Sequence, residues 1–179
     1  VHDVDVRDDP DLPLALDELR RFPSPPTTLF DTLWQGAYPR VYDQGIPAAR
    51  WFTDYVATYL ERDVRQVLNV GDMTAFGTFL RLAAGRTGQE VNLATLGSDV
   101  GVSHNTARSW LSVLEATFVC VRLPVWHRNI RKRSVRTPKL HWLDSGLVCH
   151  LLGIQSPEQL VSHPLRGAVF ESWVFAEVY

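Results

Sequence analysis

The segment that most constrains the fold is residues 92–143, where two closely spaced helical patterns precede an arginine-rich hairpin. Apolar residues recur at helical spacing over 93–100, and Gly101 can adopt the positive φ that ends a helix. Ser103 can then cap a second helix. The positions of that helix that we expect to be buried keep the same period: Ala107, Trp110, Leu111 and Leu114. This spacing predicts a helix-turn-helix, with Gly97 small where its two helices come close.

The second helix would leave one polar face free. Side chains that can hydrogen-bond to base edges or phosphates lie at its cap and along this face: Ser103, His104, Asn105, Arg108, Ser109 and Ser112. Side chains of this length reach the DNA when such a helix lies in the major groove. The face is therefore a candidate recognition surface for double-stranded DNA.

Two short strand patterns, at 118–124 and 139–143, enclose a strongly basic loop. Residues 119–143 include seven basic and no acidic side chains, in a chain whose net charge is −2. Six of the seven are predicted to contact DNA: Arg128, Arg131, Lys132, Arg133, Arg136 and Lys139. Phosphate is the commonest counter-charge for such a patch, because each neutralised phosphate releases condensed counterions. The alternative is a solvated loop, or one that pairs with residues 1–18, which carry seven acidic side chains and one basic side chain.

Composition excludes several classes of protein. A chain of 179 residues with 45% hydrophobic residues is long and apolar enough to form a core. No apolar run approaches the roughly 20 residues of a membrane span, and the first residues lack the basic-then-apolar pattern of a signal peptide, so we expect no membrane association and a cytoplasmic location. Cys120 and Cys149 are expected to be reduced core thiols. The histidines lack the spacing of a zinc site, and no metal ligands are predicted.

The expected fold is mainly α: a helical bundle plus a winged helix-turn-helix with a short β-hairpin wing. Its expected parts are an acidic linker or docking arm (1–28), a helical connector resembling a lid (29–90), the winged-helix domain (91–153) and C-terminal helices (154–179). Further helices are predicted at 29–35, 47–68, 73–84, 145–152, 157–163 and 167–179, three of them capped by Asp72, Asp144 and Ser156. Both ends of the sequence suggest a piece of a longer gene product, since it starts at Val1 and stops within an apolar helix.

Several short motifs resemble those of one known family. They are LPLALDEL (12–19), GAYP (36–39), YLERDV (59–64), LAAGRTG (82–88), the helix-turn-helix, KR (132–133), PKLHWLDSGL (138–147) and GAVFE (167–171). Their order is similar to that in prokaryotic AAA+-like ATPases that carry a C-terminal DUF4143 domain. The resemblance implies an ATPase core before this region, and after it a strand-rich domain similar to PD-(D/E)XK nucleases.

No catalytic residue is predicted. The sequence lacks a Gly-x-x-x-x-Gly-Lys-Ser/Thr loop, so no cofactor is expected in this chain, although the resemblance implies ATP and magnesium for the full-length family. Residues 154–179 would be the start of a truncated nuclease-like region. A nuclease metal site needs at least two oxygen ligands, and Glu171 is a single carboxylate. We therefore expect a non-enzymatic, DNA-binding winged-helix part of such an ATPase. The alternative is an interaction module without direct DNA contact, in which the winged helix serves protein assembly and the basic hairpin binds an acidic partner or the ATPase core. Self-association through the C-terminal helix is also expected.

Overall fold

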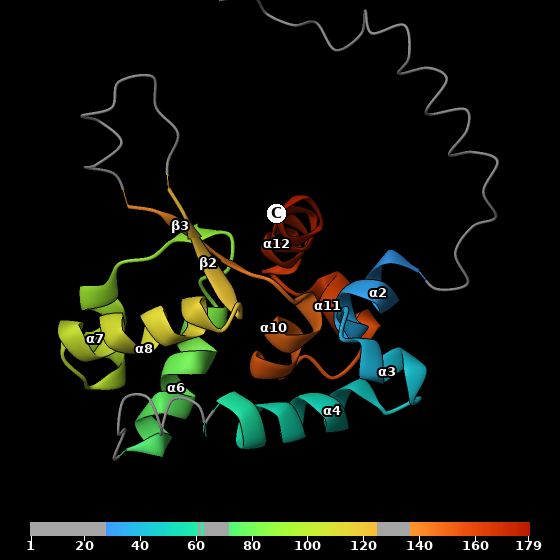
Figure 1. Cartoon of the computed structure of the whole chain (residues 1–179). Coiled ribbons are helices and arrows are strands. Elements are labelled where there is room, and N and C mark those ends of the chain that lie inside the picture. Colours follow the sequence, from blue (N-terminus) through green and yellow to red (C-terminus); the bar gives the residue numbers. More distant parts are fainter. Residues whose placement is uncertain (1–27, 61, 63–71, 125–136) are drawn as a thin grey trace, which may run out of the picture.

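The computed structural model describes residues 28–60, 62, 72–124 and 137–179, which form a mainly helical fold with one small sheet (Figure 1). The N-terminal helices are α2 (Leu29–Gln35), α3 (Pro39–Asp43), α4 (Ala48–Tyr55) and the π-helical turn η2 (Val56–Leu60). The central elements are α6 (Met73–Ala84), β1 (Gln89–Glu90), α7 (Leu93–Val100), α8 (His104–Ala116), β2 (Cys120–Leu123) and β3 (Lys139–Trp142). The last helices are α10 (Ser145–Leu151), α11 (Pro157–Ser162) and α12 (Arg166–Val178). The predicted fold class is confirmed. The acidic arm before Thr28 lies outside the described residues.

The elements from α6 to β3 follow the order of a winged helix-turn-helix. Three helices and the short strand β1 precede the hairpin formed by β2 and β3, and all pairs in the sheet are antiparallel, in the order β1-β3-β2. Cys120 pairs with Trp142 and Leu123 with Lys139, so the hairpin closes toward the basic loop. β1 was not predicted, because a strand of two residues has no periodicity to detect.

Local signals set the helix-turn-helix geometry. The Asn92 side chain caps α7, and Gly101 ends it with a φ of 83°. A Cβ at Gly97 would lie 2.9 Å from the Val102 carbonyl oxygen, so this glycine makes room for the turn and not only for the second helix. The Trp110 ring packs edge-on against Phe76 and Phe79, each at a centroid distance of 5.3 Å, which fixes α8 on α6.

The buried face of α12 packs against β3 and α10, and a polar contact ties it to β3. His141 Nδ1 lies 3.1 Å from Ser172 Oγ, which in turn lies 2.7 Å from Thr87 Oγ1. The ring of His141 also stacks on Phe175. All three hydrogen-bonding side chains are buried, so they join α12, β3 and the end of α6 without reaching solvent.

A buried carboxylate joins α2 to α10. Asp144 caps α10, as predicted, by accepting a hydrogen bond from the Leu147 amide (2.6 Å), and it also accepts one from the Ala37 amide (2.7 Å). Burial raises the pKa of Asp144, although the backbone donors act in the opposite direction. Gly36 and Gly146 leave the space for this contact.

The N-terminal half adds two features that the sequence did not predict. The helix expected over 47–68 is confirmed over 48–60, but its second part is the π-helical turn η2, into which α4 continues after Tyr55; 61 and 63–71 lie outside the described residues. The helix α3 was not predicted, although Pro39 at its first position favours a helix start. Both cysteines are free and buried, as expected.

Within the described ranges, every helix is too short or too polar to cross a bilayer.

Candidate nucleic-acid interface

The buried face of α8 determines which of its side chains face outward. Ala107, Trp110, Leu111 and Leu114 are buried, as the period predicts. The opposite face consists of exposed side chains, which are the predicted contact residues His104, Asn105, Arg108, Ser109 and Ser112. The predicted exposure of this face is confirmed. Its role in binding stays a prediction.

Two of the predicted hydroxyl groups already have partners within the helix. Ser103 Oγ accepts a hydrogen bond from the Thr106 amide (3.1 Å) and so caps α8. Ser112 Oγ donates to the Arg108 carbonyl oxygen (2.9 Å). These two hydroxyl groups therefore have less hydrogen-bonding capacity left for a ligand than their exposure suggests.

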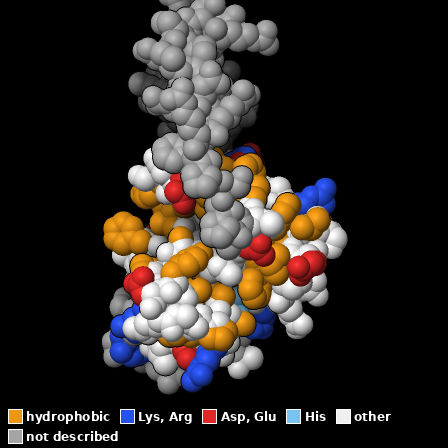
Figure 2. All heavy atoms as spheres, turned by 90° about the vertical axis from the view of Figure 1, so that its right-hand side faces the viewer, with side chains coloured by type: hydrophobic (Ala, Val, Ile, Leu, Met, Phe, Trp, Pro, Cys, Tyr) orange, Lys and Arg blue, Asp and Glu red, His pale blue; other side chains and the backbone are white. Residues whose placement is uncertain are grey.

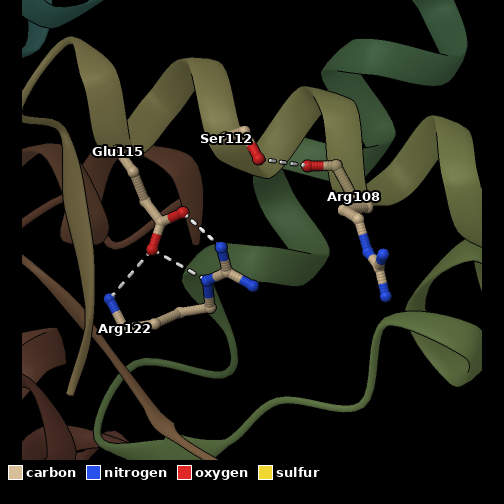
Figure 3. A network of polar contacts seen from close by, with 4 residues as sticks. All are labelled: Arg108, Ser112, Glu115 and Arg122. Atoms are coloured by element: carbon tan, nitrogen blue, oxygen red, sulfur yellow. Dashed lines mark hydrogen bonds and ion pairs between the residues drawn. The ribbon is translucent and has the colours of Figure 1, made fainter. Parts of the chain in front are cut away.

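Arg108 is the cation of this face. Figure 3 shows its side chain extending from α8. The dashed line from Ser112 ends at the backbone carbonyl oxygen of Arg108 and not at its guanidinium group. Across the described ranges, no hydrogen bond or ion pair engages the side chains of His104, Asn105, Arg108 or Ser109. Four side chains from the first turns of α8 are therefore available to a partner.

An ion pair ties the wing to the end of α8 (Figure 3). Arg122 Nε and Nη2 donate to the two carboxylate oxygens of Glu115 at 2.8 and 2.6 Å, and the Arg122 amide also points to Oε1 (3.3 Å). These hydrogen bonds raise the pKa of Arg122, while burial acts in the opposite direction. Glu115 was not predicted; its signal in the sequence is a carboxylate in the last turn of a helix that leads directly into a strand.

Lys139 also has a carboxylate partner. Its Nζ lies 2.8 Å from Glu171 Oε1 on α12, and both side chains are about half exposed. Two of the seven hairpin cations, Arg122 and Lys139, are thus balanced by carboxylates that the charge count over the hairpin alone did not include. An exposed pair of this kind is weak and can exchange its partner for phosphate. Lys139 stays a predicted DNA contact.

The remaining predicted wing contacts lie in 125–136, outside the described residues. They are Arg128, Arg131, Lys132, Arg133 and Arg136. The structure does place the two ends of this loop. Leu123 and Lys139 pair beside a hollow of about 310 Å³, whose walls include Asn92, His104 and Arg122. The base of the wing and the first turn of α8 therefore border one concave surface.

No group of three or more metal-ligating side chains occurs among the residues that the structure describes. The Glu171 carboxylate forms the ion pair with Lys139.

A family model described as a domain of unknown function (DUF8612) matches residues 26–158. Two mycobacterial proteins are also similar: uncharacterized protein Rv2008c of Mycobacterium tuberculosis and uncharacterized protein Mb2031c of Mycobacterium bovis. Each is 33% identical over 154 residues, which is 83% of this chain and 34% of the relative. The chain thus spans about a third of the length of these curated relatives. No solved structure matches the chain.

These comparisons overturn the expected membership in the AAA+-like ATPases with a DUF4143 domain. The matching family is DUF8612, and the names of the two relatives mention no ATPase. The described motifs that carried the resemblance include caps and turns such as 36–39 and 144–147, which many helical proteins need for the same physical reasons. The expected ATPase core and nuclease-like neighbour rested on that resemblance and lose their basis with it.

Proposed function

The chain belongs to the DUF8612 family, and we propose that it binds double-stranded DNA through the exposed face of α8 and the basic wing. The observation that carries this proposal is the available polar face of α8 within a winged helix-turn-helix. An α-helix with its side chains is about 10–12 Å across, and the major groove of DNA is about 12 Å wide. A cytoplasmic location is part of the proposal, since the DNA of a bacterial cell lies there.

The composition of the face fits base readout. Asn105 and Arg108 lie on the first turns of α8, the part of a recognition helix that contacts base edges. Asparagine pairs with adenine, and arginine with guanine, through two hydrogen bonds each. His104 borders the hollow beside the wing, where a phosphate would approach. The helix would read the sequence, and the wing would supply most of the charge.

We expect the chain to bind duplex DNA with a strong salt dependence. A count of roughly 3 to 5 phosphate contacts gives a slope of log affinity against log salt concentration near −3 to −4. Fluorescence anisotropy with a labelled duplex, repeated at several salt concentrations, measures this slope. Absence of binding at low salt would exclude the proposed function.

A second candidate function, protein interaction, is favoured by one surface of α12. Phe170 and Val174 lie one helical turn apart, and each is 41% exposed. Only Val169 and Ser172 of this helix are fully buried, on its other side. Burying each exposed apolar side chain would contribute about 1.5–3 kcal/mol, which favours self-association through this face.

We therefore expect the chain to dimerise at micromolar concentration and the double variant Phe170→Ser, Val174→Ser to remain monomeric. Sedimentation equilibrium measures both masses, and far-UV circular dichroism checks that the variant is folded. If the unmodified chain is a monomer at these concentrations, the face is not an interface between copies.

A further inference from the structure

A hollow of about 630 Å³ lies between α3 and the first turns of α4. Its walls include Arg40 of α3, the connecting residues 44–47, and Arg50, Trp51 and Asp54 of α4. In Figure 1, α3 lies at the opposite end of the molecule from α7, so this hollow is separate from the candidate DNA interface. Its volume falls within the range of about 300–1,000 Å³ that small-molecule sites occupy.

The hollow carries two arginines with no carboxylate partner in the part of the chain that the structure describes. Arg50 and Asp54 are one turn apart on α4, yet no ion pair joins them. The guanidinium carbon of Arg40 lies over the Trp51 ring, 5.7 Å from its centroid, and this stacking leaves the N–H groups of Arg40 available. Two arginines against one aspartate leave a net charge of +1. Figure 2, which views the molecule from this side, shows basic side chains with acidic ones among them along its lower part.

The backbone adds donors at the same place. α4 follows Pro47, which offers no side-chain cap, and the first helical hydrogen bond is that of the Trp51 amide to the Pro47 carbonyl. Of the amides before it, that of Arg50 belongs to a residue that lines the hollow, and it lacks a protein acceptor within the described ranges. Such amides, together with the positive end of the helix dipole, attract anions.

The connection between α3 and α4 leaves access to the hollow. Gly45 has a φ of 61°, and a Cβ built there would meet nothing within 4 Å. The segment that borders the hollow is thus open on its outer side, and a ligand can approach the arginines.

We propose that this hollow binds a small phosphate monoester, with the phosphate between Arg40, Arg50 and the first amides of α4. A carboxylate is satisfied by one arginine fork, whereas a phosphate has enough oxygens for two guanidinium groups and backbone donors. Its negative charge is opposite in sign to the net positive charge of the hollow. Ile46 and Pro47 supply apolar walls of the hollow for the organic part of the ester.

Isothermal titration calorimetry of the whole chain with AMP, inorganic phosphate and adenosine tests this site. We expect AMP to bind best, inorganic phosphate more weakly, and adenosine at least about tenfold more weakly than AMP, because the charge-assisted hydrogen bonds go to the phosphate. Arg40→Gln and Arg50→Gln should each weaken AMP binding by about tenfold, and the two together by about a hundredfold.

Arg81→Gln is the matched control, since Arg81 is an exposed arginine on α6 and does not line the hollow. It should bind AMP as the unmodified chain does, and circular dichroism should show all variants folded. Three results would each overturn the proposal: no AMP binding, equal affinity for AMP and adenosine, or unchanged AMP affinity in the folded double variant. If inorganic phosphate binds as tightly as AMP, the organic part contributes nothing to binding, and the site is not one for a phosphate monoester.

Discussion

Replacing Gly146 with alanine should lower the free energy of unfolding by about 3 kcal/mol. A Cβ at this position would lie 2.6 Å from the Gly36 nitrogen and 2.7 Å from the Gln35 carbonyl carbon. Both are backbone atoms, so no side chain can rotate away from the added methyl group. Relief requires α2 and α10 to separate, which would also disturb the contact between Asp144 and the Ala37 amide.

Urea denaturation followed by circular dichroism measures this decrease. Gly167→Ala is the matched control, because a Cβ at Gly167 in α12 would meet nothing within 4 Å. Alanine there should leave stability unchanged or raise it slightly, since alanine is the better helix former. A Gly146 variant as stable as the Gly167 variant would show that α2 and α10 can part at little cost.

The sequence predicted the helix-turn-helix well because its signals are local. Each one lies within a few residues of the feature that it sets: Ser103 caps the helix that follows it, and Gly101 ends the helix before it. The burial of Trp110 follows from the same 3.6-residue period. Local hydrogen bonds and periodicity therefore sufficed to place the face that we propose binds DNA.

Features set by tertiary contacts were not predicted. β1 is a strand only because β3 lies beside it, and the π-helical turn after α4 has no sequence signature that we could use. Asp144 was predicted as a cap, but its second bond, to Ala37, joins residues 107 positions apart. Sequence spacing carries no information about such contacts.

The charge of the candidate site was predicted only in part. Counting residues over the hairpin gave seven cations, yet Arg122 is held by Glu115 and Lys139 by Glu171, and both carboxylates lie outside the counted segment. Fewer cations are therefore free than the count indicates. Lys139 must exchange Glu171 for phosphate before it can contact DNA, and the other predicted wing contacts lie in 125–136, outside the described residues.

The wing and the recognition helix should differ in how their substitution affects DNA binding. Replacing Arg131, Lys132 and Arg133 together with alanine should weaken binding to every duplex alike. It should also reduce the magnitude of the salt slope by about 3, one for each phosphate that is no longer neutralised. This is the largest decrease in affinity that we expect, because the charges act on DNA of any sequence.

Arg108→Ala should instead cost about 1–3 kcal/mol on a preferred sequence and little on other duplexes, since a base contact contributes only where the base is correct. The preferred sequence is first selected from a pool of random duplexes. Anisotropy titrations of both variants, on the selected duplex and on a scrambled one, then separate the two effects.

Arg166→Ala serves as the control for the removal of one positive charge, because Arg166 is exposed on α12 and belongs to neither surface. If it weakens binding as much as Arg108→Ala does, the effect of Arg108 is general electrostatics. If the Arg108 variant, like the wing variant, weakens binding to the selected and the scrambled duplex equally, Arg108 does not contribute to base recognition. A decrease confined to the selected duplex requires the Arg108 side chain to contact a base, because removing a phosphate contact weakens binding to both duplexes.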